Sequence, residues 1–335
     1  MSVSTHIAPG RLSRAVDRAL INRPMVADDV PWAVNHHLTA AMRTFVEECA
    51  QRDVPFWNGK LSNNTFNTAG NRFKTFNWYR LWEYASCYDL LIQAFAPGAR
   101  FVDVGGAGCY FSFFLAANGY KITIVDSDPY LIDLSSAMTK RLGLQRQLSC
   151  VCRDITEPQP LEIPDVDGAY SISVMEHLAQ PLRSQFLRSV RALLPPSSGL
   201  AFFTFDYGEF SSPYLQSLRS LSALCVEIEQ AGFVIEGNRY TAEMAQLKRK
   251  PYGAYFHDVY ARTKTFCYAD PLGAQMRFFF RSIGSKLRVA SLKQQIKQVF
   301  QGPAPDYNFC RLLVRVDGEH STQKMNHVSC DHGAD

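Results

Sequence analysis

Short apolar runs alternate with longer segments of helical periodicity through the middle of the chain. Each run is rich in β-branched and aromatic residues and is bounded by turn-forming residues, which is typical of strands. The predicted strands span residues 101–104, 122–125, 148–152, 169–174, 200–205, 233–235 and 309–316. Predicted helices over residues 110–118, 181–194 and 212–232 lie between them. This alternation indicates a doubly wound α/β fold, in which helices cover both faces of a mostly parallel seven-stranded sheet.

The same patterns divide the chain into further parts. An N-terminal segment has a predicted helix over residues 40–49 and an asparagine-rich loop over 61–71, and an aromatic helix over 76–95 leads into the sheet. The predicted parts are a helical extension (1–75), an α/β core (76–240), a helical insertion (241–306), a closing strand (307–318) and a disordered tail (319–335). Small and polar residues dominate the tail, and its histidines and cysteine match no zinc-binding spacing.

The turn after the first predicted strand carries the clearest chemical signal. Asp103 lies near the end of this strand, and a small-residue loop follows it: Gly105, Gly106, Ala107 and Gly108. A tight glycine turn lets a ligand approach the backbone, and the helix that begins after it offers unpaired amides. Asp126 ends the second strand, 21 residues after Gly105, where a carboxylate can accept hydrogen bonds from ribose hydroxyls. The chain is therefore expected to bind a nucleoside-containing cofactor.

Two classes of nucleoside cofactor use this geometry. A dinucleotide-binding loop needs a small residue at its third conserved position, where this chain has the bulky Phe111. The fourth strand and its end read DGAYSISVMEHL over residues 167–178. Together with DVGGAG at 103–108 and RLWEY at 80–84, this segment resembles the class I S-adenosylmethionine-dependent methyltransferases. The resemblance covers about residues 75–240 and implies a Rossmann-like fold, S-adenosylmethionine as cofactor, and an antiparallel closing strand.

The resemblance also implies roles for residues at the strand ends. Asp103 and the loop backbone would orient the amino-acid end of the cofactor, Asp126 with Ser127 would bind the ribose, and Asp154 with Ile155 would meet the adenine. Ser173 and Val174 would line the floor beneath the methyl group. Arg80 and Tyr84, on the aromatic helix, would cover the cofactor carboxylate and the substrate.

Acid–base chemistry is predicted immediately after the fourth strand. Glu176 and His177 are the acid and the imidazole expected at this end of the sheet. An imidazole with a pKa of ~6.5 suits proton acceptance at neutral pH. A purely structural role for His177 at the start of a helix is the alternative interpretation. Asp206 and Tyr207, at the end of the fifth strand, are predicted to contact the acceptor. The expected activity is methyl transfer to a small-molecule or glycan- or lipid-linked acceptor, at oxygen.

Two other functions stay open on the sequence alone. One is a nicotinamide-dependent oxidoreductase, which Phe111 and the Glu-His pair disfavour. The other is a catalytically silent binding protein with the methyltransferase fold. Ala107 and Cys109 keep this alternative open, because they stand where many members have glycine. Ala107 would be strained if its φ were positive.

Charge and composition indicate the cellular compartment and the kinds of partner that the protein can bind. The chain has 335 residues, an apolar fraction of 47% and nine cysteines, an odd number that suggests reduced thiols in a cytoplasmic protein. The net charge is +4, yet residues 241–302 hold six lysines and five arginines against two aspartates and one glutamate, a local net charge of +8. This segment is predicted to act as a lid that attracts an anionic acceptor, and residues 278–300 would suit peripheral membrane contact. No metal or nucleic acid is expected.

Overall fold

The computed structural model describes residues 21–25, 29–51, 78–159, 161–196, 198–209, 220–240 and 306–318. The asparagine-rich loop and the polar tail lie outside these residues. So does the basic insertion predicted over 241–306, except for its last residue. The predicted lid, the membrane-contacting segment 278–300 and the tail therefore stay predictions.

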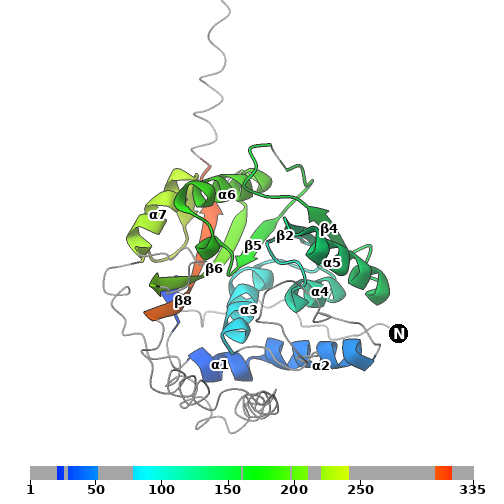
Figure 1. The fold of residues 1–335 in the computed structure, drawn as a ribbon. Helices are drawn as coiled ribbons and strands as arrows, with labels where there is room; N and C mark the ends of the chain where they lie inside the picture. The colour runs from blue at the N-terminus through cyan, green and yellow to red at the C-terminus, as the bar shows by residue number, and fades with distance from the viewer. Residues whose placement is uncertain are drawn as a thin grey trace, which may run out of the picture.

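Eight strands form one sheet (Figure 1). They are β1 (Arg23–Pro24), β2 (Arg100–Val104), β3 (Lys121–Asp126), β4 (Leu148–Cys152), β5 (Gly168–Ile172), β6 (Leu200–Glu209), β7 (Phe233–Ile235) and β8 (Asp306–Val316). Their order is β1-β8-β6-β5-β2-β3-β4, and β7 also pairs with β8. Strands β2 to β6 are parallel to one another, and β8 runs antiparallel to β6 and β7. The doubly wound, mostly parallel sheet and its antiparallel closing strand are confirmed, and the two-residue β1 adds a strand that the pattern did not predict.

Seven α-helices and two 3-10 turns accompany the sheet in the described part of the chain. They are α1 (Asp29–Asn35), α2 (His37–Gln51), α3 (Trp78–Leu90), η3 (Ile92–Ala94), α4 (Tyr110–Ala117), α5 (Pro129–Leu142), η4 (Met175–His177), α6 (Gln180–Leu193) and α7 (Leu221–Gln230). The predicted helix over 212–232 is described only from Ser220, whose side chain caps α7. None of the described helices is long and apolar enough to cross a membrane.

Local sequence chemistry explains α5, which the apolar pattern did not predict. Asp128 caps its first turn by accepting hydrogen bonds from the amides of Tyr130 (2.9 Å) and Leu131 (3.3 Å). Pro129 stands at the first helical position, where its missing N–H costs nothing. Gly143 ends the helix in the left-handed conformation. These caps fix where the chain turns after β3, and therefore where the end of β3 points.

The sheet separates two hydrophobic cores. On one face, Phe101, Tyr170 and Phe202 pack in a cluster with side chains of α3, α4 and α5. On the other face, Phe203 and Phe205 pack with side chains of α6 and α7. Since adjacent residues of one strand point to opposite faces, both faces of β6 are buried, as expected for a central strand. The candidate site lies on the first of these faces, at the carboxyl ends of the parallel strands.

The N-terminal helices extend the first face outward. In Figure 1, α1 and α2 lie beyond α3 and α4, on the side away from the sheet. Phe45 of α2 meets Phe114 of α4 edge to face, with 5.8 Å between ring centroids. Arg311 of β8 is buried beneath this layer, where it donates to Ser86 Oγ of α3 (3.0 Å) and lies over the ring of Trp82. The extension therefore holds α3 against the sheet.

Candidate active site

The small-residue loop after β2 has the sharp turn that the sequence predicts. Gly105 and Gly108 both have φ near +77°, a conformation that side chains with a Cβ rarely adopt. A Cβ at Gly105 would also lie 2.6 Å from Val174, and one at Gly106 would overlap the carboxylate of Asp103. Ala107, by contrast, is not among the residues with positive φ. The alanine therefore fits the loop without strain.

Asp103 supports this loop from beneath. Its side chain is only 1% exposed, and its carboxylate accepts a hydrogen bond from Ser112 Oγ of α4. Ser112 Oγ also contacts Tyr170 Oη (2.7 Å) of β5. Burial raises the pKa of Asp103 to about 7, although the hydrogen bond from Ser112 opposes the shift. The carboxylate is thus enclosed by the loop and α4, and the role of Asp103 in orienting the cofactor stays a prediction.

Asp126 lies beside the loop at the end of β3. Its Oδ2 accepts from the Ala107 amide (3.2 Å) and its Oδ1 from the Asp128 amide (3.0 Å). Burial raises the pKa of the Asp126 carboxyl, and these amides oppose the shift. The amide of Ser127 also stabilises this carboxylate. A carboxylate has about four lone-pair sites, so three amide contacts leave room for a ligand hydroxyl. The side chain is partly exposed, and the exposed Ser127 follows it. The ribose role of Asp126 stays a prediction.

The end of β4 adds the next position along the same edge. Asp126 of β3 pairs in register with Cys152 of β4, so the residues that follow Cys152 lie beside the end of β3. Asp154 is exposed, and its Oδ1 accepts from the amide (2.8 Å) and the hydroxyl (2.7 Å) of Thr156. Ile155 is half-buried. Asp154 and Ile155 therefore lie beside the end of β3, and their contacts with adenine stay a prediction.

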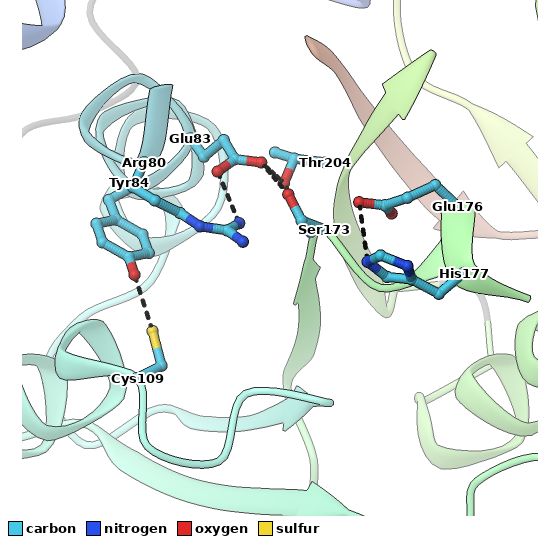
Figure 2. Close-up of polar contacts among 8 residues, drawn as sticks. All are labelled: Arg80, Glu83, Tyr84, Cys109, Ser173, Glu176, His177 and Thr204. Atoms are coloured by element: carbon cyan, nitrogen blue, oxygen red, sulfur yellow. Dashed lines mark hydrogen bonds and ion pairs between the residues drawn. The ribbon is translucent and has the colours of Figure 1, made fainter. Parts of the chain in front are cut away.

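A buried carboxylate that the sequence analysis missed connects α3 to the ends of β5 and β6. Glu83 is 0% exposed. Its Oε1 accepts from Ser173 Oγ (2.6 Å) and Thr204 Oγ1 (2.7 Å), and its Oε2 accepts from Arg80 Nη1 (2.8 Å) (Figure 2). Glu83 is the glutamate of the RLWEY segment (80–84), whose Arg80 and Tyr84 were the residues predicted for the site. An acid within an otherwise aromatic and apolar helix is the signal that could have identified it.

Ser173 has an unusual backbone conformation at the point where β5 ends. Its φ is +53°, and Asp165 is the one other residue besides glycine with positive φ in the described ranges. The Ser173 amide donates to the carbonyl of Thr204 (3.0 Å), and the hydroxyl is held by Glu83. This turn ends β5 at Ile172, earlier than predicted, and directs Val174 onto Gly105. Strained residues of this kind cluster at functional sites.

Glu176 and His177 follow in η4. Glu176 is 0% exposed, while the side chain of His177 is 47% exposed, with 3.8 Å between His177 Nε2 and Glu176 Oε1. Burial raises the pKa of Glu176 well above its usual value, and the nearby Asp206 raises it further. Burial and the positive charge of Arg80 lower the pKa of His177, so its imidazole is neutral at pH 7. A neutral imidazole can accept a proton.

The two residues predicted at the end of β6 lie on opposite faces. Asp206 is on the face of Thr204 and Glu83, and burial with the negative charge of Glu83 raises its pKa to about 7. Tyr207 is buried in the second core with the side chains of α6 and α7. The structure therefore does not bring Tyr207 together with Asp206, and its contact with the acceptor stays a prediction. The strand alternation puts its ring on the far side of the sheet.

Arg80 and Tyr84 lie together on α3, as predicted, with Tyr84 facing the loop. The ring of Tyr84 stacks on Phe111 with centroids 5.0 Å apart, and its hydroxyl meets Cys109 Sγ at 3.2 Å (Figure 2). Burial raises the pKa of the Cys109 thiol to about 11, which makes it a poor nucleophile. Phe111 thus fills the space that a dinucleotide-binding loop would leave open.

Comparison with known proteins adds one sequence match. Residues 101–197 match the family model described as "Methyltransferase domain". This part of the chain is similar to methyltransferase domains. The doubly wound sheet and the glycine loop agree with the class I fold that the resemblance implies. The roles of the loop, Asp126 and the residues after β4 toward S-adenosylmethionine stay predictions.

Solved structures resemble the methyltransferase domain only at low similarity. The [4+2]-cyclase SpnF is 17% identical, with 72% of this chain and 84% of that chain covered and a TM-score of 0.45. A sarcosine dimethylglycine methyltransferase from Galdieria sulphuraria is 15% identical, with 66% and 79% covered and a TM-score of 0.44. A TehB-like methyltransferase from Corynebacterium glutamicum is 19% identical, with 68% and 85% covered and a TM-score of 0.39. No curated protein is similar enough to match.

Proposed function

We propose that the protein transfers a methyl group from S-adenosylmethionine to a small-molecule or glycan- or lipid-linked acceptor, with proton removal by the Glu176–His177 pair. One observation carries this proposal. The end of β5, which bears Glu176 and His177, lies against the cofactor loop, because Val174 packs onto Gly105. A reacting group beside η4 would therefore be next to the cofactor.

The chain's own residues have a limited task in this chemistry. The cofactor supplies an electrophilic methyl group, and transfer requires the acceptor to be held in line with it. A hydroxyl acceptor, which the sequence analysis expects, loses a proton during transfer, and so does an amine. His177 has the exposure and protonation state to accept that proton. Glu83 and Arg80 hold the strand end from which His177 projects.

Two further features stay proposals that rest on the sequence. The local charge of +8 over residues 241–302 favours an anionic acceptor, and this segment is proposed to cover the site. Residues 278–300 are proposed to contact a membrane surface.

Calorimetric titration with S-adenosylmethionine tests the proposal. Asp126→Ala should weaken cofactor binding tenfold or more, because each charge-assisted hydrogen bond is worth roughly 1.5–3 kcal/mol. Asp133→Ala, at an exposed position of α5, is the matched control and should bind as the wild type does. Equal affinity of the two variants would refute the ribose assignment. Binding of the cofactor without turnover on any acceptor would favour the catalytically silent alternative, and tighter binding of NAD would favour the oxidoreductase.

A further inference from the structure

Two carboxyl groups at the ends of β5 and β6 have oxygen atoms that accept no hydrogen bond from another described residue. Both oxygens of the fully buried Glu176, whose carboxyl interacts with its own backbone amide, are in this position, and so is Oδ1 of Asp206. His177 Nε2 lies 3.8 Å from Glu176 Oε1, beyond hydrogen-bond distance. Figure 2 shows the Glu176 carboxylate pointing from η4 back toward the strand ends and Glu83. Buried polar atoms without partners are rare in folded proteins, so this pair requires an explanation.

Among the residues that the structure describes, the charges do not balance these groups. Glu176 interacts electrostatically with Asp206, Glu83 and Arg80, so the four side chains form one cluster. Arg80 is hydrogen-bonded to Glu83, which also accepts from two hydroxyls. The cluster thus has three carboxyls and one guanidinium, and the guanidinium is already engaged. A buried carboxylate is costly unless a cation pairs with it.

An organic cation suits this site better than a metal ion. In the part of the chain that the structure describes, no three acidic, histidine or cysteine side chains converge closely enough to hold a metal. Glu176 and Asp206 approach from two adjacent strand ends, as suits a group with several N–H donors. The pKa values of both carboxyls are raised. A bound cation would lower these pKa values and favour the charged carboxylates, which agrees with a cationic ligand.

We propose that Glu176 and Asp206 receive the ammonium group of an amine acceptor, so that the methyl group is transferred to nitrogen. This inference rests on the proposed function, and it replaces the expected oxygen with nitrogen and the anionic acceptor with a cationic one. The ammonium gives one proton to Glu176 of the Glu176–His177 pair, and the freed nitrogen lone pair forms the bond to the methyl carbon. The carbon–sulfur bond breaks, and its electron pair stays on sulfur. The products are an N-methylammonium ion and S-adenosylhomocysteine.

The cofactor's own sulfonium is the other cation that could lie against these carboxyls. The two sources differ in what each predicts. If the acids serve the sulfonium, their removal weakens S-adenosylmethionine relative to the uncharged thioether S-adenosylhomocysteine. If they serve the acceptor, the ratio of these two affinities is unchanged and amine binding is lost.

Calorimetry on the full chain saturated with S-adenosylhomocysteine tests the inference. The probes are benzylamine and ethanolamine, each against its matched alcohol and carboxylate: benzyl alcohol and benzoate, ethylene glycol and glycolate. We expect at least one amine to bind tenfold or more tightly than both of its partners. Glu176→Gln and Asp206→Asn should each weaken amine binding at least tenfold. Glu229→Gln, on the surface of α7, should leave amine binding unchanged.

Each opposite result overturns the inference. Equal or tighter binding of the alcohol or carboxylate, no amine binding at millimolar concentration, or unchanged amine affinity in both variants would do so. A shifted ratio of S-adenosylmethionine to S-adenosylhomocysteine affinity would assign the acids to the cofactor instead. Failure of the proposed function is separate, because there the wild type binds neither form of the cofactor.

Discussion

Glu83 offers the sharpest test of how the site is held together. The substitution Glu83→Gln keeps the size of the side chain and an oxygen that can face Ser173 and Thr204. It replaces the oxygen that accepts from Arg80 with an amide group that can only donate. The two hydrogen bonds from the hydroxyls change from charged to neutral, and the bond from Arg80 is lost.

The magnitude follows from these contacts. A hydrogen bond to a charged group contributes about 1.5–3 kcal/mol, and a neutral one about 0.5–1.5 kcal/mol. The side chain of Arg80 is about one-third exposed, so water can replace part of the hydrogen bonding that its guanidinium loses. Removal of a buried charge also lowers the desolvation cost of the site. We expect the free energy of unfolding to fall by about 2 kcal/mol.

Urea denaturation followed by circular dichroism measures this change. Asp165→Asn is the matched control, because it breaks an ion pair with Arg100 in which the Asp165 side chain is 76% exposed, and it should cost less than about 1 kcal/mol. A double-mutant cycle with Thr204→Val should give a coupling energy near 1 kcal/mol. If Glu83→Gln is as stable as the control, or if the coupling is zero, the network does not hold the strand ends.

Three further predictions concern catalysis, the loop and pH. His177→Ala should lower kcat by about 10²-fold with little change in cofactor affinity, and a variant that retains most of its kcat would show that positioning alone suffices. Gly106→Ala should destabilise the protein more than Gly143→Ala, because only the former would overlap the carboxylate of Asp103, and equal melting temperatures would contradict this. The raised pKa of Asp206 means that its contribution to stability is present below about pH 4 and is lost as pH rises through about 7. Asp206→Asn should reduce that loss by at most about 3 kcal/mol between pH 5 and pH 8, as measured by unfolding at these two values, because about two pH units of the shift lie in this window.

The features predicted from the sequence are those that local chemistry determines. β4 has the predicted bounds, and the loop between β2 and α4 has the predicted turn, because glycines and strand patterns act over a few residues. The helix α5 lacked a strong apolar pattern, although Asp128, Pro129 and Gly143 supply its caps. Start and stop signals would have identified it where hydrophobic periodicity did not.

The direction of side chains is the part of the site that the sequence predicts least. Asp103 was expected to orient the cofactor, and the structure shows its carboxylate directed at Ser112 and enclosed. Tyr207 was expected to contact the acceptor, and the alternation of β6 puts it on the face of Phe203 and Phe205. The period of two along a strand could have predicted the second outcome. The first depends on how α4 packs, which is a tertiary contact.

Glu83 shows why the acidic cluster is only partly contained in the part of the chain that matches the methyltransferase model. Its partners Ser173 and Thr204 are 90 and 121 residues away in the sequence, and only the docking of α3 on the sheet brings them together. The match begins at residue 101 and ends at residue 197. It therefore contains the cofactor loop, Asp126 and Glu176, but neither Glu83 nor Asp206. If the proposed acceptor site is correct, its charge depends on two segments that flank the matched region, and substitutions there are expected to change acceptor preference more than cofactor binding.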